Sequence, residues 1–332
     1  MKKLTTILTF LLITSVSVKA QLNRFQYSTE KMGAPFNLIF AATDKVTADK
    51  LSEECLLLVD SLVHIFSDYD SASELNWINL HAGITPVNIS SQMIDLLLIS
   101  KKACIESNGA FNIAIGPLSI LWRKARKLKK IPTSDEIRLT KKITDFSLVK
   151  IDSANHTVFL PLKGMRLDFG GLGKGYIAQV VSNYLITKGI KHTMIDAGGK
   201  IIMTNPINPN DSWKIGINLS ESKTDILDQK LHLQNCAVAT SGDIYQFMYY
   251  KGKKYSHIIN PQTGYGLNTL RNVTVIAKDG AQADWLSTAC SILSIKASMQ
   301  LVANNDGEIL IAEQKRERVK YYKSKGFDNL LK

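Results

Sequence analysis

Apolar residues recur every three to four positions in several long stretches of the chain, which is the spacing of an amphipathic helix. The clearest case begins at Thr47, where Leu51, Cys55, Leu58 and Leu62 follow one another at this interval. On this pattern we expect helices over residues 47–66, 91–107, 174–188 and 281–293, and a further helix beginning near Pro117.

Shorter apolar or alternating runs predict β-strands between these helices. Because strands and helices mix without strict alternation, the order favours an α+β fold over a doubly wound parallel sheet. With 332 residues, 45% of them hydrophobic, the chain is long enough for one large or two medium domains. The expected strands are residues 36–42, 147–152, 156–160, 165–168, 193–196, 200–204, 213–218, 232–239, 254–259, 272–277 and 308–312.

A glycine-rich turn joins the predicted strand at 165–168 to the helix at 174–188. Four glycines fall within six positions, and Lys174 stands among them. Such a turn directs unpaired N–H groups, together with the positive end of the helix dipole, at whatever lies above it. It therefore suits phosphate, although a glycine-rich helix entry without any ligand is an equally good interpretation.

Neither of the common phosphate motifs is present in this turn. Walker A would need a glycine where Asp168 stands and Ser or Thr where Gly175 follows Lys174. The spacing of the dinucleotide motif G-x-G-x-x-G is not met either. The turn alone does not decide its ligand.

Residues 1–20 have the pattern of a secretory signal peptide. Lys2 and Lys3 precede an apolar run, and small residues stand near a cleavage point at Ala20. We expect an exported, periplasmic or envelope-associated protein whose single domain spans residues 21–332. No cysteine near Ala20 offers a site for a lipid, and no later stretch has the ~20 apolar residues of a transmembrane segment.

The chain is basic, with a formal net charge of +12. Without Lys2, Lys3 and Lys19 of the signal, 38 basic residues remain against 29 acidic ones, a net charge of +9. Much of the excess lies in residues 123–130, which we interpret as a solvated face, and we expect no nucleic acid as partner. Attraction to an anionic surface or a phosphorylated ligand stays open.

The four cysteines are far apart in the sequence and form no C-x-x-C pair. Single buried thiols are the favoured interpretation. An exported protein also permits a disulfide, whose pairing the sequence does not choose.

A polar loop at residues 67–76 contains one aromatic residue, Tyr69. Ser71 and Glu74 have the spacing of a capping box that opens a short helix. Such a loop, ordered by its cap, can present Tyr69 to another ring.

Several short motifs in the second half carry chemically useful side chains. His257 is expected on a strand that leads into an Asn-Pro-x-Thr-Gly turn at Asn260. Asp284 and Thr288 are four residues apart, so they share one helix face and could bind a hard cation together with backbone carbonyls. Each motif also has a purely structural interpretation.

Taken in order, these motifs resemble the ApbE family of FAD:protein FMN transferases. The resemblance covers nearly the whole chain after the signal, and it rests on the register of eight motifs, since no single one is specific. The matching segments are residues 32–36, 73–76, 109–118, 168–176, 196–199, 239–245, 257–264 and 283–288.

The resemblance implies a fold and a reaction. The fold would be a two-lobed α+β unit, T-fold-related and rich in antiparallel sheet, with FAD between the lobes. The enzyme would bind FAD and Mg²⁺ and transfer FMN to a Ser or Thr hydroxyl of an acceptor protein, releasing AMP. Helix-end N–H groups and Mg²⁺ together would neutralise the pyrophosphate.

The resemblance also assigns roles to individual residues. Asp284, Thr288 and the carbonyl of Gly171 would bind the metal. His257 is the candidate general base, because the imidazole pKa lies near neutrality, and Asp284 is a rival for that role. The flavin nucleotide would be lined by Met32, Tyr69, Ala110, Phe111, Asn112, Asp168, Lys174 and Ile258.

This chain departs from the family pattern at three places. The family's Phe-Asp-x-Thr is Phe111 to Ala114 with Asn112, Gln179 replaces a frequent Asp, and Asn260 replaces the Asp of His-x-x-Asp-Pro. Loss of the carboxylate at Asn112 would weaken recognition of a donor group. The alternatives are therefore an FAD pyrophosphatase that yields FMN and AMP, and a non-catalytic FAD-binding paralogue.

Overall fold

The computed structural model describes residues 21–217, 227, 229–242, 247–315 and 318–331. Three expectations of the sequence lie outside these ranges: the signal peptide at 1–20, the end of the predicted strand at 218, and residues 243–245 of the motif at 239–245.

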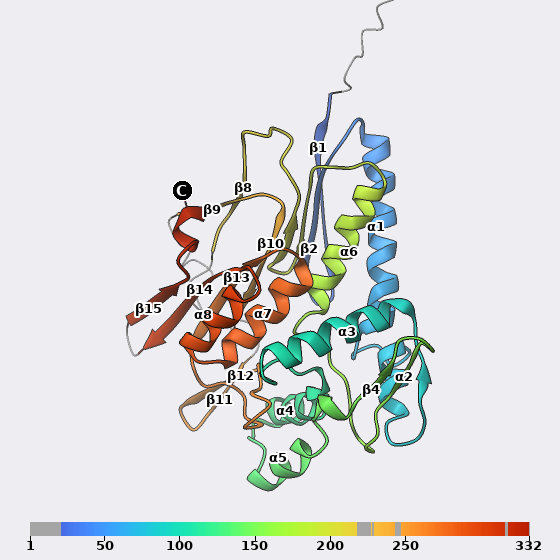
Figure 1. The fold of residues 1–332 in the computed structure, drawn as a ribbon, viewed down its shortest axis with the longest axis vertical. Helices are drawn as coiled ribbons and strands as arrows, with labels where there is room; N and C mark the ends of the chain where they lie inside the picture. Colours follow the sequence, from blue (N-terminus) through green and yellow to red (C-terminus); the bar gives the residue numbers. More distant parts are fainter. Residues whose placement is uncertain (1–20, 218–226, 228, 243–246, 316–317, 332) are drawn as a thin grey trace, which may run out of the picture.

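An eight-stranded sheet forms the centre of the molecule, and every strand pairs antiparallel with its neighbours (Figure 1). The strands follow in the order β1-β2-β6-β7-β10-β13-β14-β15. Their bounds are β1 (Asn23–Lys31), β2 (Ala34–Ala42), β6 (Thr193–Ala197), β7 (Lys200–Met203), β10 (Cys236–Ser241), β13 (Arg271–Ala277), β14 (Glu308–Lys315) and β15 (Arg318–Lys323).

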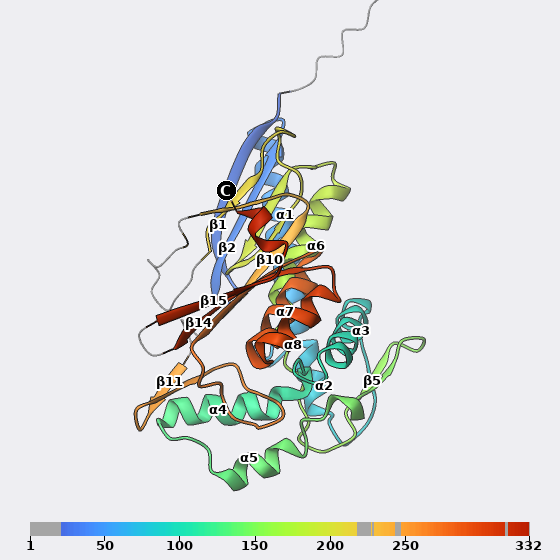
Figure 2. The same cartoon turned by 60° about the vertical axis from the view of Figure 1, so that its left-hand side comes forward.

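Four helices cover one face of this sheet (Figure 2). Phe36, Leu38 and Phe40 alternate along β2, and all three are buried in the main core cluster. A second apolar cluster joins Met203, Val238 and other sheet residues to the β8–β9 hairpin and the C-terminal 3-10 helix, so both faces of the sheet are partly covered. The helices are α1 (Lys45–Phe66), α6 (Gly173–Thr187), α7 (Gly280–Ile292) and α8 (Ile295–Ala303); the hairpin strands are β8 (Trp213–Ile215) and β9 (Leu231–Leu233), and the 3-10 helix is η3 (Phe327–Leu330).

A smaller region of helices and short strands lies at one end of the sheet (Figures 1 and 2). In its own apolar cluster, Trp122 of α4 is fully buried beside Ile137 of α5 and Met248 of β11, and its indole N–H donates to the carbonyl of Gly264 at 2.9 Å. The elements are α2 (Glu74–Leu80), α3 (Ser91–Glu106), α4 (Gly116–Leu128), α5 (Ser134–Lys141), β3 (Val87–Asn88), β4 (Lys150–Asp152), β5 (Thr157–Phe159), β11 (Phe247–Tyr250), β12 (Lys253–Ser256), η1 (Ile113–Ile115) and η2 (Phe146–Leu148).

The structure confirms a mixed α/β fold with antiparallel sheets, and it confirms helices at every predicted position. The four cysteines are free thiols; Cys55 and Cys290 are buried as expected, whereas Cys104 and Cys236 are only half-buried. Elements that the sequence pattern did not indicate are β1, β3, α5, β11, α8, β15 and the three 3-10 helices η1, η2 and η3. Within the described residues, no helix has both the length and the apolar character needed to cross a membrane.

Four local predictions are wrong. Ser73, not Ser71, caps α2 by accepting from Asn76 N, and Glu74 instead accepts from Ser90 N at 2.7 Å. The predicted strand at 165–168 is irregular, because its backbone bonds to side chains and loops rather than to a neighbouring strand. The predicted strand at 232–239 is divided by Asn235, whose φ of 48° interrupts it. His257 lies one residue beyond the end of β12.

Candidate functional site

The first turns of α6 and α7 meet at two glycines. A Cβ at Gly175 would lie 2.1 Å from the carbonyl oxygen of Gly280, so only glycine permits this approach. Across the contact, Gly175 N donates to Asp284 Oδ2 at 3.0 Å. The carboxylate of Asp284, whose side chain is 1% exposed, is thereby fixed against the start of α6.

The three predicted metal ligands come together at this contact. Thr288 Oγ1 lies 3.2 Å from the carbonyl oxygen of Gly171, and Asp284 stands one turn earlier on the same face of α7. A Cβ at Gly171 would lie 3.0 Å from Phe111 Cε2 and 3.1 Å from Thr288 Cγ2, so the glycine itself is packed closely between these two side chains. A carboxylate, a hydroxyl and a carbonyl are hard oxygen donors and fit Mg²⁺.

Two lysines face the same carboxylate. Lys200 Nζ lies 3.5 Å from Asp284 Oδ1 and also donates to the carbonyl of Thr240. Burial, and then the neighbouring charge of Lys200, lower the pKa of Lys174 below its ordinary value. Burial likewise raises the pKa of Asp196, whose Oδ1 accepts from Gly199 N at 2.7 Å. Lys174 of α6 and Lys200 of β7 therefore bring two ammonium groups into a partly desolvated site beside Asp284.

Sequence reasoning missed Lys200. Its only signal is a charged residue at the start of an apolar strand, directly after the glycine pair of the motif at 196–199. The structure shows that this position turns the side chain toward α7 rather than toward solvent, since Lys200 is 8% exposed.

The β1–β2 turn lies beside the same cluster. Met32 has a φ of 54°, and Gly198 N donates to the carbonyl of Pro35 at 2.9 Å. A Cβ at Gly198 would lie 2.7 Å from Ala34 Cβ and 3.9 Å from Lys174 Nζ. The turn that carries Met32 is thus close to the ammonium group of Lys174.

A second charged cluster lies in front of the glycine turn. Asp168 Oδ1 accepts from Gly170 N at 2.8 Å, and its Oδ2 lies 3.3 Å from an Arg123 nitrogen. The same Arg123 nitrogen lies 2.5 Å from Asp68 Oδ2, and the guanidinium covers the ring of Tyr69 at 4.4 Å. Arg123 belongs to the basic run that we had interpreted as a solvated face, and for this residue that interpretation is wrong.

The electrostatics of this cluster depend on Arg123. Burial, and then the charge of Asp168, raise the pKa of Asp68, while Arg123 opposes both effects. Burial lowers the pKa of Arg123, but the charges of Asp168 and Asp68 outweigh it and leave the pKa above its ordinary value. The three groups therefore stabilise one another as a set.

The segment at 110–112 is packed rather than open. Ala110 and Phe111 are buried, and Phe111 contacts Gly171 and the ring of Trp285. Asn112 Oδ1 accepts from Ala114 N at 2.8 Å, and its Nδ2 donates to the carbonyl of Thr144 at 2.7 Å. Because an aspartate could not make the second bond, Asn112 anchors η1 in a way that the family's carboxylate would not.

Gln179, the second departure from the family pattern, also has a structural partner. Its Oε1 accepts from Gly280 N at 3.0 Å, and its Nε2 donates to Asn183 Oδ1 at 3.0 Å. The side chain therefore satisfies an otherwise free N–H group at the start of α7 and ties α6 to α7.

His257 and Ile258 begin a loop whose backbone is firmly held. Ile258 N donates to Ser256 Oγ at 3.1 Å, and Leu267 N donates to the carbonyl of Ile258 at 2.8 Å. Asn260 Oδ1 accepts from Gln262 N at 2.8 Å. The neutral amide of asparagine can therefore make the hydrogen bond of this turn in place of an aspartate carboxylate. The bond from Trp122 to Gly264 joins the same loop to α4.

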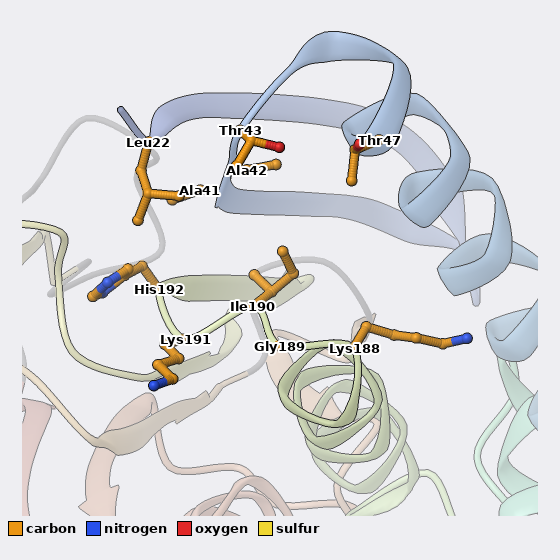
Figure 3. Close-up of a pocket in the computed structure, with 10 residues that line it drawn as sticks. All are labelled: Leu22, Ala41, Ala42, Thr43, Thr47, Lys188, Gly189, Ile190, Lys191 and His192. Atoms are coloured by element: carbon orange, nitrogen blue, oxygen red, sulfur yellow. The ribbon is translucent and has the colours of Figure 1, made fainter. Parts of the chain in front are cut away.

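The pocket in Figure 3 is separate from these clusters. It has a volume of about 280 Å³ and lies at the far end of β2 and α6. Because α6 has 15 residues, this end is about 22 Å from the glycine turn. The pocket is lined by Leu22, Ala41, Ala42, Thr43, Thr47, Lys188, Gly189, Ile190, Lys191 and His192.

Known proteins match this chain in sequence and in fold. The model of the ApbE family matches residues 32–311. An FAD:protein FMN transferase from Klebsiella pneumoniae is 31% identical over 80% of this chain and 81% of its own, and one from Vibrio cholerae is 26% identical over 90% of each chain. The solved structure of the flavin transferase ApbE from Vibrio cholerae has a TM-score of 0.82, covers 94% of this chain and all of its own, and is 26% identical.

The ApbE protein from Thermotoga maritima superposes with a TM-score of 0.84, over 93% of this chain and 100% of its own, at 25% identity. The mixed α/β fold with antiparallel sheets agrees with these matches. The chain therefore belongs to the ApbE family.

Proposed function

We propose that this protein transfers FMN from FAD to a Ser or Thr hydroxyl of an acceptor protein, in a Mg²⁺-dependent reaction that releases AMP. The observation that carries the proposal is the meeting of Gly171, Asp284 and Thr288 beside Lys174 and Lys200 at the start of α6. The names of the relatives, FAD:protein FMN transferases, support the same reaction.

The ammonium groups of Lys174 and Lys200 and the N–H groups at the start of α6 would bind the diphosphate of FAD. Gly171, Asp284 and Thr288 would hold Mg²⁺, which when bound withdraws charge from the diphosphate and makes phosphorus more electrophilic. The departing AMP phosphate would lie in the same field of positive charge.

His257 would accept the proton of the incoming hydroxyl. The hydroxyl oxygen then forms a bond to the phosphorus of the FMN half, and the bond from that phosphorus to the bridging oxygen breaks, so AMP leaves with the electron pair. Two features make His257 a better base than Asp284. Asp284 already accepts from Gly175 and faces Lys200, and a metal ligand is a poor proton acceptor.

We further propose that the protein is exported and acts in the periplasm or at the envelope. The signal-peptide pattern of residues 1–20 supports this location. Expression of the full chain, followed by N-terminal sequencing of the secreted or periplasmic form, tests it: a new N-terminus near Gln21 is expected, and retention of Met1 in the cytoplasm would contradict it.

The activity is tested with purified protein, FAD, Mg²⁺ and a threonine-containing acceptor, beside the same acceptor with that threonine changed to alanine. We expect AMP release, and an acceptor mass increased by FMN, only with threonine. FMN and AMP without labelled acceptor would replace the proposal with an FAD pyrophosphatase. FAD binding without AMP would replace it with a non-catalytic binding protein.

A further inference from the structure

The basic run at 123–130 begins with a residue that faces inward. Lys124 is exposed, whereas the Arg123 side chain is 28% exposed and its partners Asp68 and Asp168 are 16% and 11% exposed. Asp68 and Asp168 are 100 residues apart in the chain, and Arg123 comes from a third segment, α4. One guanidinium therefore joins the Tyr69 loop, the entry to the glycine turn and α4.

The planar guanidinium suits this position in a way that an ammonium group does not. It can place N–H groups against two carboxylates while its face lies on an aromatic ring. Arg123 meets both carboxylates and also covers the ring of Tyr69 at 4.4 Å. Tyr69 is nevertheless 75% exposed, so the opposite face of its ring remains accessible.

We propose that Arg123 is a positioning residue for the flavin ring: it fixes Tyr69 from behind, so that the accessible face of Tyr69 stacks on an isoalloxazine. This inference rests on the proposed function, which places FAD at this site. Its new element is the role of Arg123 with Asp68 and Asp168, because the family resemblance already places Tyr69 among the residues that line the flavin nucleotide.

Removal of Arg123 should loosen the loop at 67–73 and also remove the guanidinium that covers the ring of Tyr69. Two partly buried carboxylates would then face each other without a cation, and like charges at short range repel. The loop at 67–73 would move away from Asp168, although its internal bonds, such as Ser67 Oγ with Asp70 N at 3.2 Å, would remain.

The first measurement needs no ligand: amide hydrogen exchange in residues 67–73, compared among the wild type, Arg123→Gln and the matched control Lys124→Gln. We expect exchange about tenfold faster in Arg123→Gln alone. Equal exchange in all three proteins would overturn the inference, whatever their behaviour toward flavins.

The second measurement is binding of FMN and of ADP to the same proteins with Mg²⁺ present. Arg123→Gln should weaken FMN binding about tenfold and leave ADP binding unchanged. Arg123→Lys should recover little, because a point charge cannot stack and bridge at once. Equal weakening of FMN and ADP, or weakening of ADP alone, would overturn the positioning role of Arg123 for the flavin ring.

A charge-relief variant separates positioning from simple loss of folding. Asp68→Asn combined with Arg123→Gln removes the repulsion between the carboxylates of Asp68 and Asp168, so amide exchange in residues 67–73 should be slow again. FMN affinity should not recover fully, because no guanidinium covers the ring of Tyr69. If Arg123→Gln lowered FMN affinity and Asp68→Asn restored it completely, the stacking part would be wrong. A wild type that binds neither FAD nor FMN would refute the proposed function instead, and the exchange result would still report on the loop.

Discussion

The two ends of the site are built in different ways. At the end where we propose that the metal binds, here called the metal end, Asp284 is held by the backbone of Gly175 where two core helices touch. At the end where we propose that the flavin ring binds, here called the flavin end, Tyr69 is 75% exposed on a loop and is held by a side chain, Arg123. Backbone geometry thus fixes one end, and a charged side chain fixes the other.

This difference matches the chemistry that each end would perform. A metal and a diphosphate need donors that do not reorganise when charge develops. An aromatic ring must enter and leave, and a loop with few buried apolar contacts permits that movement. We therefore expect substitutions at the metal end to affect the reaction or the fold, and substitutions at the flavin end to affect ring affinity.

The largest effect is expected at Asp284. Asp284→Asn keeps an acceptor for Gly175 N but removes the charge that would face the proposed metal. Because a bound metal contributes several kcal/mol, AMP release should fall about a thousandfold, and Mg²⁺ binding measured by calorimetry should be lost. Asp135→Asn, on the exposed surface of α5, is the control. Unchanged Mg²⁺ affinity in Asp284→Asn would place the metal elsewhere.

His257→Gln should lower transfer to a threonine acceptor about a hundredfold, as expected for loss of a general base. Because the loop is fixed by Ser256, Asn260 and Leu267, FAD affinity should change little. The check is single-turnover transfer measured beside an FAD titration. A large loss of FAD affinity with normal transfer at saturation would make His257 a binding residue.

Gly175→Ala should separate the helix ends that form the metal end. Its Cβ would meet the Gly280 carbonyl at 2.1 Å, and overpacking of this kind costs about 2 kcal/mol of unfolding free energy. Gly173→Ala, two residues earlier, is the matched control, since its Cβ would meet only Phe169 Cβ at 3.6 Å. Urea denaturation compares them; equal stability would mean that the α6–α7 contact is not tight.

The smallest effect concerns pH. Burial lowers the pKa of Lys174 below the ordinary 10.5. The charged form of Lys174 therefore lowers the free energy of unfolding, and this loss of stability diminishes as pH rises through the lowered pKa. Diphosphate binding needs the charged form, so ADP affinity should fall about tenfold over that alkaline range. Lys174→Arg, whose guanidinium stays charged, should abolish the fall. A fall of equal size in Lys174→Arg would assign it to another group.

The motifs that meet at the metal end could be read from the sequence because each of them is local. The glycine turn, the four-residue spacing of Asp284 and Thr288, and the two helices all depend on neighbours within a few positions. What the sequence could not give was Lys200, since only the pairing of β7 beside β10 and α7 shows where its ammonium group points. Asn112 likewise shows its role only through Thr144, 32 residues away.

The flavin end was less predictable because it depends on contacts between distant segments. Arg123 looked like one member of a charge run, and its distinction from Lys124 arises only when α4 is placed against Asp68 and Asp168. The cap at Ser71 failed for a related reason. Ser73 can accept from Asn76 N while its own hydroxyl donates to the carbonyl of Ser67, which closes the loop.

The most direct test of the two-ended site is a crystal structure with FAD and Mg²⁺ bound. We expect the diphosphate against Lys174, Lys200 and the start of α6, the metal on Gly171, Asp284 and Thr288, and the isoalloxazine on the exposed face of Tyr69. Adenine on Tyr69, or the nucleotide in the pocket of Figure 3, would contradict it.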